Sequence, residues 1–94
     1  MPHANRSKQN RMAAANPAPS EVREARERAK HTPADAAAVI YGTTTTWEEW
    51  EQDDSSKRRM HPAFYELYLL KTGQKTLEQV LDEAAQRKAQ EGTT

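Results

Sequence analysis

The chain contains no cysteine, which excludes disulfide frameworks, zinc ribbons and thiol nucleophiles. Glycine is also scarce, and three glycines in 94 residues provide no glycine-rich phosphate-binding loop. No apolar run approaches the ~18 residues of a membrane-spanning helix. The polar segment 1–11 does not resemble the apolar centre of a secretion signal. We therefore expect a cytoplasmic protein that does not contact a membrane.

Large apolar side chains are few. Of the 33 apolar residues 15 are alanine, which leaves 18 with larger side chains. Such a set fills a helical core of roughly 50–60 residues, near the lower limit for folding without metals or disulfides. We expect no room for a substrate pocket of ~300 Å³ or more. The three histidines lack metal-binding spacing, so we expect no metal site. Because the sequence contains neither a nucleophile elbow nor a catalytic triad, we also expect no enzyme activity and no cofactor.

The net charge is zero, but the charges are segregated along the chain. Residues 1–30 carry seven basic and three acidic side chains, and residues 57–71 carry four basic and one acidic. Between them, residues 31–56 carry six acids and neither lysine nor arginine. Segregation of this kind says more about binding partners than about the fold.

Three segments are expected from composition. Residues 1–19 form a flexible basic arm, because they contain too few large apolar side chains to offset the entropy of ordering. Residues 20–73 form the folded core, and residues 74–94 form a C-terminal helix with a frayed tail. The basic residues of the arm are Arg6, Lys8 and Arg11.

The fold class is predicted to be all-α, because no segment alternates with the period of a strand. Five helices have start signals of the Ser, Thr or X-Pro type. In the second, Thr32, Pro33 and Asp35 form a capping pattern, and Gly42 is expected to supply the turn that follows. The expected N-caps are Ser20, Thr32, Thr43, His61 and Thr76.

Two tryptophans at positions i and i+3 are expected to supply much of the small core. Trp47 and Trp50 follow an alanine-rich helix, and small side chains allow a neighbouring helix to approach closely. The alternative is that the indole rings stack on nucleic-acid bases, as aromatic residues do in single-strand binders. Burial in the core is the favoured interpretation.

Three stretches of the sequence resemble a known family. They are S-E-V-R-E-A-R-E-R-A, T-P-A-D-A-A-A-V-I-Y-G-T-T-T-T-W-E-E-W-E and R-R-M-H-P-A-F-Y-E-L-Y-L-L-K-T. Together they are similar to lambda-repressor-like (XRE-type) helix-turn-helix domains, and in particular to short bacterial and prophage transcriptional regulators. The resemblance covers roughly Pro19–Thr72, and its most specific parts are Thr46–Glu51 and Arg59–Ala63. It implies a five-helix lambda-repressor-like domain.

The resemblance also implies a small regulator that binds double-stranded DNA. The third helix would enter the major groove with Thr44, Thr45, Glu48 and Glu49, and the second would place its N-terminus near a phosphate. The basic arm and the basic loop would contact further phosphates. The predicted DNA-contacting residues are Thr32, Thr43, Thr44, Thr45, Glu48, Glu49, Lys57, Arg58, Arg59, Arg6, Lys8 and Arg11.

The acidic third helix supports a second hypothesis, an interaction protein in place of a DNA reader. Five acids between residues 48 and 54 oppose binding to phosphates, which attract cations. They would suit a basic groove on a nucleic-acid-binding protein, for example a host defence complex inhibited by a phage protein. A solvated acidic surface is the simplest interpretation, and a homodimer is compatible with either function. The acids are Glu48, Glu49, Glu51, Asp53 and Asp54.

Burial of Trp50 can be tested by truncation. Replacing Trp50 with Ala should lower the free energy of unfolding by ~3–5 kcal/mol, because it leaves a large cavity in the core. Urea denaturation measures the loss. A mild effect, together with complete iodide quenching of tryptophan fluorescence in the unmutated protein, would instead place Trp50 on the surface.

Overall fold

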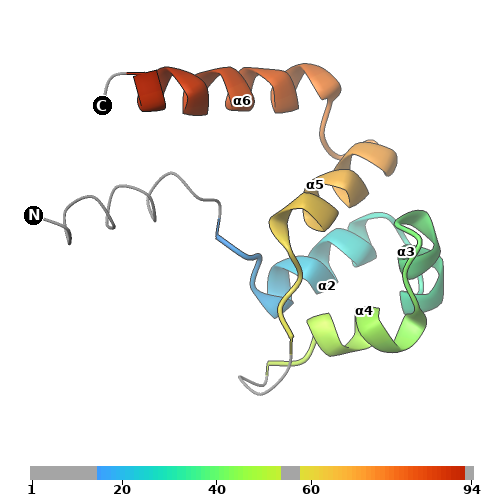
Figure 1. Cartoon of the computed structure of the whole chain (residues 1–94). Coiled ribbons are helices and arrows are strands. Elements are labelled where there is room, and N and C mark those ends of the chain that lie inside the picture. Colours follow the sequence, from blue (N-terminus) through green and yellow to red (C-terminus); the bar gives the residue numbers. More distant parts are fainter. Residues whose placement is uncertain (1–14, 54–57, 93–94) are drawn as a thin grey trace, which may run out of the picture. The chain divides into compact units, whose positions relative to one another are not determined.

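The computed structural model describes residues 15–53 and 58–92, which form five α-helices and no strand (Figure 1). This confirms the all-α prediction. Residues Asn16–Lys75 form one compact unit, and α6 belongs to a separate unit. Within the described residues, no helix is long and apolar enough to cross a bilayer. The helices are α2 (Pro19–Arg28), α3 (Pro33–Val39), α4 (Thr44–Trp50), α5 (Pro62–Lys71) and α6 (Leu77–Gly92).

Four of the five expected N-caps are confirmed. The Thr32 hydroxyl accepts a hydrogen bond from the Asp35 backbone N–H at 3.1 Å, and the Asp35 carboxylate accepts from the Thr32 N–H. Thr43 caps α4 by accepting from the Thr46 N–H. His61 caps α5 through its ring Nδ1, and Thr76 forms the expected capping pair at the start of α6.

The first helix of the compact unit begins earlier than predicted. Its first residue is Pro19 and its N-cap is Ala18, in place of the expected Ser20 cap. The Ala18 N–H donates to the Glu21 carboxylate at 2.8 Å, so an acidic side chain one turn later satisfies the helix start. Pro17 and Pro19 are buried, so the compact unit extends four residues beyond the expected boundary, to Asn16.

Three helices end in the same tight reversal, with one residue in the left-handed conformation. In each, the next N–H along the chain bonds back to a carbonyl of the last helical turn. The left-handed residue is Lys30 after α2, Tyr41 after α3 and Gly73 after α5. The turn after α3 therefore depends on Tyr41 and not on Gly42, which was expected to supply it.

The core of the Asn16–Lys75 unit is small and centred on aromatic side chains. Trp47 lies 4.9 Å from Tyr68 and 5.8 Å from Trp50, ring centroid to ring centroid. Trp50 is only 6% exposed, as the spacing predicted. The remaining buried hydrophobic residues are Val22, Ala25, Ala36, Ala37, Ile40 and Met60.

Alanine side chains explain the close approach of α3 and α4. Ala36 and Ala37 are buried, whereas Ala34 and Ala38 on the other side of α3 are exposed. The short, uniform side chains of the buried pair leave room for the tryptophan-bearing face of α4. In α6, Leu77 and Leu81 are exposed.

The left-handed backbone at Lys30 gives a testable stability prediction. Lys30 has φ 61°, a conformation that costs a residue with a side chain about 1–2 kcal/mol and costs glycine little. Replacing Lys30 with Gly should therefore raise the free energy of unfolding by about 0.5–1 kcal/mol, once the greater freedom of unfolded glycine is included. Urea denaturation measures the change.

The matched control is Lys30→Ala, which removes the same charge and keeps the β-carbon. It should give no stabilisation. Equal stabilisation by alanine and glycine would assign the effect to the lost lysine charge and not to the backbone.

Candidate functional site

Helix α4 separates its side chains into a buried face and an exposed face. Trp47 and Trp50 are buried, whereas Thr44, Thr45 and Glu48 are exposed. Glu49 is half-buried. Three of the four residues that the family resemblance assigned to a DNA groove are thus exposed on α4, and the fourth, Glu49, is partly covered.

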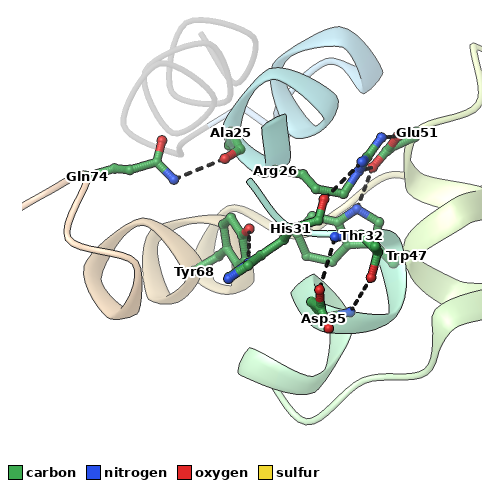
Figure 2. A network of polar contacts seen from close by, with 9 residues as sticks. All are labelled: Ala25, Arg26, His31, Thr32, Asp35, Trp47, Glu51, Tyr68 and Gln74. Atoms are coloured by element: carbon green, nitrogen blue, oxygen red, sulfur yellow. Dashed lines mark hydrogen bonds and ion pairs between the residues drawn. The ribbon is translucent and has the colours of Figure 1, made fainter. Parts of the chain in front are cut away.

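A carboxylate at the end of α4 fixes this helix to α2 (Figure 2). Glu51 accepts two hydrogen bonds from the Arg26 guanidinium, 2.6 Å from Nε and 2.9 Å from Nη2. The same carboxylate accepts the Trp47 indole N–H at 2.5 Å. Arg26 also donates to the carbonyl oxygen of His31, in the connection between α2 and α3. The rotation of α4 about its axis is therefore set by polar contacts as well as by tryptophan packing.

The Arg26–Glu51 ion pair is largely shielded from water, and each side chain shifts the pKa of the other. The Arg26 and Glu51 side chains are 17% and 12% exposed. Burial alone raises the pKa of the Glu51 carboxyl, but the hydrogen bonds from Arg26 and Trp47 and the Arg26 charge outweigh it, and the pKa lies below its ordinary value. The hydrogen bond to Glu51 raises the pKa of Arg26 in return.

This finding corrects the place of Glu51 in the acidic run. The sequence grouped Glu51 with a solvated or partner-binding acidic surface, whereas the structure turns it inward onto Arg26. The acidic surface near α4 therefore consists of Glu48, Glu49 and Asp53 among the described residues. Its charge is smaller than the sequence suggested.

A second polar contact joins the start of α3 to α5. His31 Nδ1 lies 2.8 Å from the Tyr68 hydroxyl, and the two rings meet edge to face (Figure 2). Burial raises the pKa of Tyr68 to about 12, so the hydroxyl stays protonated at neutral pH. Neither partner could be assigned from sequence, because 37 residues separate them.

Helix α5 and the residues just after it form hydrogen bonds with the C-terminal parts of α2 and α3. Gln74 donates to the Ala25 carbonyl oxygen at 3.0 Å. The Lys71 ammonium donates to the Val39 carbonyl oxygen at the end of α3 and to the Tyr41 hydroxyl. A cation at a helix C-terminus is favourable because it offsets the partial negative charge of the unpaired carbonyls. The proximity of Lys71 also lowers the pKa of the Tyr41 hydroxyl.

The remaining predicted contact residues fall into two groups. Thr32 and Thr43 are exposed, but the hydroxyl of each is already engaged in capping its own helix. Arg58 is exposed and Arg59 is half-buried, and both precede α5. Four predicted residues lie outside the part of the chain that the structure describes: Arg6, Lys8, Arg11 and Lys57.

An open groove of about 630 Å³ lies beside α4, contrary to the expectation that the chain has no room for a pocket. The expectation rested on the small size of the core, whereas this groove is open to the surface and takes no space from the core. Its apolar walls include Trp50 and Phe64, whose rings stack at 5.9 Å and 27°. Phe64 of α5 is 46% exposed.

One buried polar atom of α4 lacks a hydrogen-bond partner among the described residues. The buried Trp50 Nε1 has no hydrogen-bond acceptor among the described residues, whereas the Trp47 indole N–H is satisfied by Glu51. An unmade hydrogen bond of this kind costs ~1–3 kcal/mol. The two tryptophans, equivalent in the sequence pattern, thus differ chemically.

No cluster of metal-ligating side chains occurs within residues 15–53 and 58–92. No protein-family model matches the chain, and no curated protein matches its sequence. The candidate site is therefore defined by its geometry: the exposed face of α4, with the groove and Arg58 and Arg59 next to it.

The Arg26–Glu51 pair gives a prediction for stability against pH. Because the folded pKa of Glu51 is lowered, its stabilising contribution is present above the ordinary pKa of 4.5 and is lost as the pH falls through the folded pKa. Glu51→Gln should cost about 2–3 kcal/mol at pH 7, since it leaves the Arg26 charge without its partner. The free energy of unfolding of the Glu51→Gln variant should fall less between pH 7 and pH 3 than that of the unmutated protein, because the variant has no carboxylate to protonate at this position.

Urea denaturation between pH 7 and pH 3 measures both effects. Glu48→Gln is the control, because Glu48 lies on the same helix and is exposed. Its effect should stay within about 0.5 kcal/mol. Equal effects of the two substitutions would contradict the structural role assigned to Glu51.

Proposed function

We propose that the protein is a small DNA-binding transcriptional regulator of the bacterial or phage type, built on a lambda-repressor-like helix-turn-helix. In this proposal α3 and α4 are the two helices of the motif, and α4 enters the major groove. The observation that carries the proposal is the division of α4, with both tryptophans held in the core and Thr44, Thr45 and Glu48 facing outward.

The geometry of the α3–α4 pair supports this assignment. Two seven-residue helices are joined by the tight turn at residues 40–43, and the second helix has its exposed polar side chains in its first turns. A helix-turn-helix reads DNA with the N-terminal residues of its second helix. The Arg26–Glu51 pair supplies the rigidity that such reading requires, because it holds α4 against α2.

The side-chain chemistry of α4 is compatible with base readout. Threonine hydroxyls bond base edges, and the threonine methyl contacts the methyl group of thymine. A glutamate in the major groove accepts a hydrogen bond from the cytosine amino group. The phosphate contacts that supply affinity would come from Arg58 and Arg59, together with Lys57 and the basic N-terminal arm.

A second candidate function is favoured by one observation. Helix α4 carries no cation, and Glu48 and Asp53 are exposed at and after it. An acidic helix face suits a basic groove on a protein that itself binds nucleic acid. In this alternative the chain is an interaction protein that competes with nucleic acid for that groove.

Neutralising Glu48 and Glu49 separates the two functions. If α4 lies in the major groove, the double change to Gln removes two negative charges close to phosphates. Affinity for a random duplex should then rise about 3- to 10-fold at low salt, and less at 200 mM salt. Fluorescence anisotropy with a labelled 20-base-pair duplex measures the affinity.

The matched control changes Glu24 and Glu27 to Gln, because both are exposed on α2 and the change in net charge is the same. An equal rise in the control would show a general charge effect and would contradict groove docking. Unchanged DNA affinity in the Glu48/Glu49 variant, combined with loss of a basic protein from a bacterial-lysate pull-down, would favour the interaction protein.

A further inference from the structure

The groove beside α4 has the composition of a binding site for an organic anion. It is lined by residues 40–42 of the turn after α3, by Thr46 and Trp50 of α4, and by Phe64 of α5. The charged residues that line it are Arg58 and Arg59, the other ionisable ones are His61 and Tyr41, and no aspartate or glutamate of the described residues is part of the lining. Its volume of about 630 Å³ falls within the ~300–1,000 Å³ range of small-molecule sites.

Its apolar surface is largely aromatic. Trp50 and Phe64 are stacked, and the His61 ring lies 6.1 Å from Phe64 at 65°. Tyr41, whose left-handed backbone ends α3, is 84% exposed at the same groove. Two exposed aromatic rings, Tyr41 and Phe64, thus lie at the same groove as the nearly buried Trp50.

The basic groups at the groove are hydrogen-bond donors. Arginine side chains only donate, and their planar guanidinium groups match the geometry of a carboxylate. The Nδ1 atom of His61 accepts from the Ala63 N–H, so the proton of the neutral ring sits on Nε2, which donates.

From this combination we propose that the groove binds a small aromatic carboxylate. The aromatic ring would pack against Trp50 and Phe64, and the carboxylate would be held by Arg58 and Arg59. A neutral aromatic compound would meet the same walls but leave the donors unpaired. A free inorganic anion would meet the donors but leave the apolar walls exposed. This proposal does not depend on DNA binding, because it concerns the free protein.

The test compares indole-3-acetate with indole-3-acetamide, which share the aromatic body and differ in charge. Each is titrated into the ¹⁵N-labelled full chain, and the two indole N–H signals are followed by NMR. The acetate should shift the Trp50 signal with a dissociation constant on the order of 1 mM, as suits a fragment of this size. The Trp47 signal should move much less, because its N–H is held by Glu51. The acetamide should bind about tenfold more weakly.

Two variants and one control test whether the compounds bind in the groove. Arg58→Gln plus Arg59→Gln should abolish the preference for the acetate, whereas Arg23→Gln plus Lys30→Gln, with the same loss of charge on exposed positions around α2, should retain it. Phe64→Ala should weaken the binding of both compounds at least 3-fold. Because the Phe64 side chain is partly exposed, the fold should tolerate this substitution.

Three results would overturn the proposal. The first is the absence of a Trp50 shift at 10 mM acetate. The second is equal binding of acetate and acetamide. The third is a preference that survives removal of Arg58 and Arg59. Because no DNA is present, none of these outcomes bears on the proposed regulator function, and a failure of DNA binding would leave this result unaffected.

Discussion

The arrangement of the helices depends on one carboxylate. Glu51 accepts hydrogen bonds from the Arg26 guanidinium and the Trp47 indole N–H, and so connects the end of α4 to the last turn of α2 and to the aromatic core. A buried charge is costly unless it is paired and hydrogen-bonded, and here both conditions are met. Since Arg26 also holds the His31 carbonyl oxygen, the network fixes the point where α3 begins.

These contacts fix the rotation of α4 about its axis, and that rotation determines which of its side chains face solvent. With Trp47, Trp50 and Glu51 turned inward, the 3.6-residue period of the helix places Thr45 and Glu48 on the solvent side, and Thr44 is exposed at the first residue of the helix. Trp50 then lies between the core and the groove, which explains how it is nearly buried and still forms part of a wall. Two candidate surfaces, the polar face and the aromatic groove, thus result from a single orientation.

Short helices make this arrangement possible in about 60 residues. Helices of seven to ten residues have little intrinsic stability, and they persist here because their ends are satisfied by side-chain caps and by left-handed reversals. Two of the three reversals use Lys30 and Tyr41, residues that pay a conformational cost at these positions. At Tyr41 part of the cost is offset by Lys71, whose ammonium lies 4.1 Å from the ring centroid and donates to the hydroxyl.

The sequence by itself determined the helical class, four of the five helix starts and the burial of Trp47 and Trp50, because caps and apolar periodicity act over three or four residues. Only the tertiary structure decided that Glu51 pairs with Arg26, that His31 meets Tyr68, that Met60 in a polar segment is fully buried, and that Phe64 stays exposed at a groove. Each of these outcomes depends on how segments that are distant in the chain pack against one another in space. Caps and apolar periodicity act within a few residues, so they do not specify that packing.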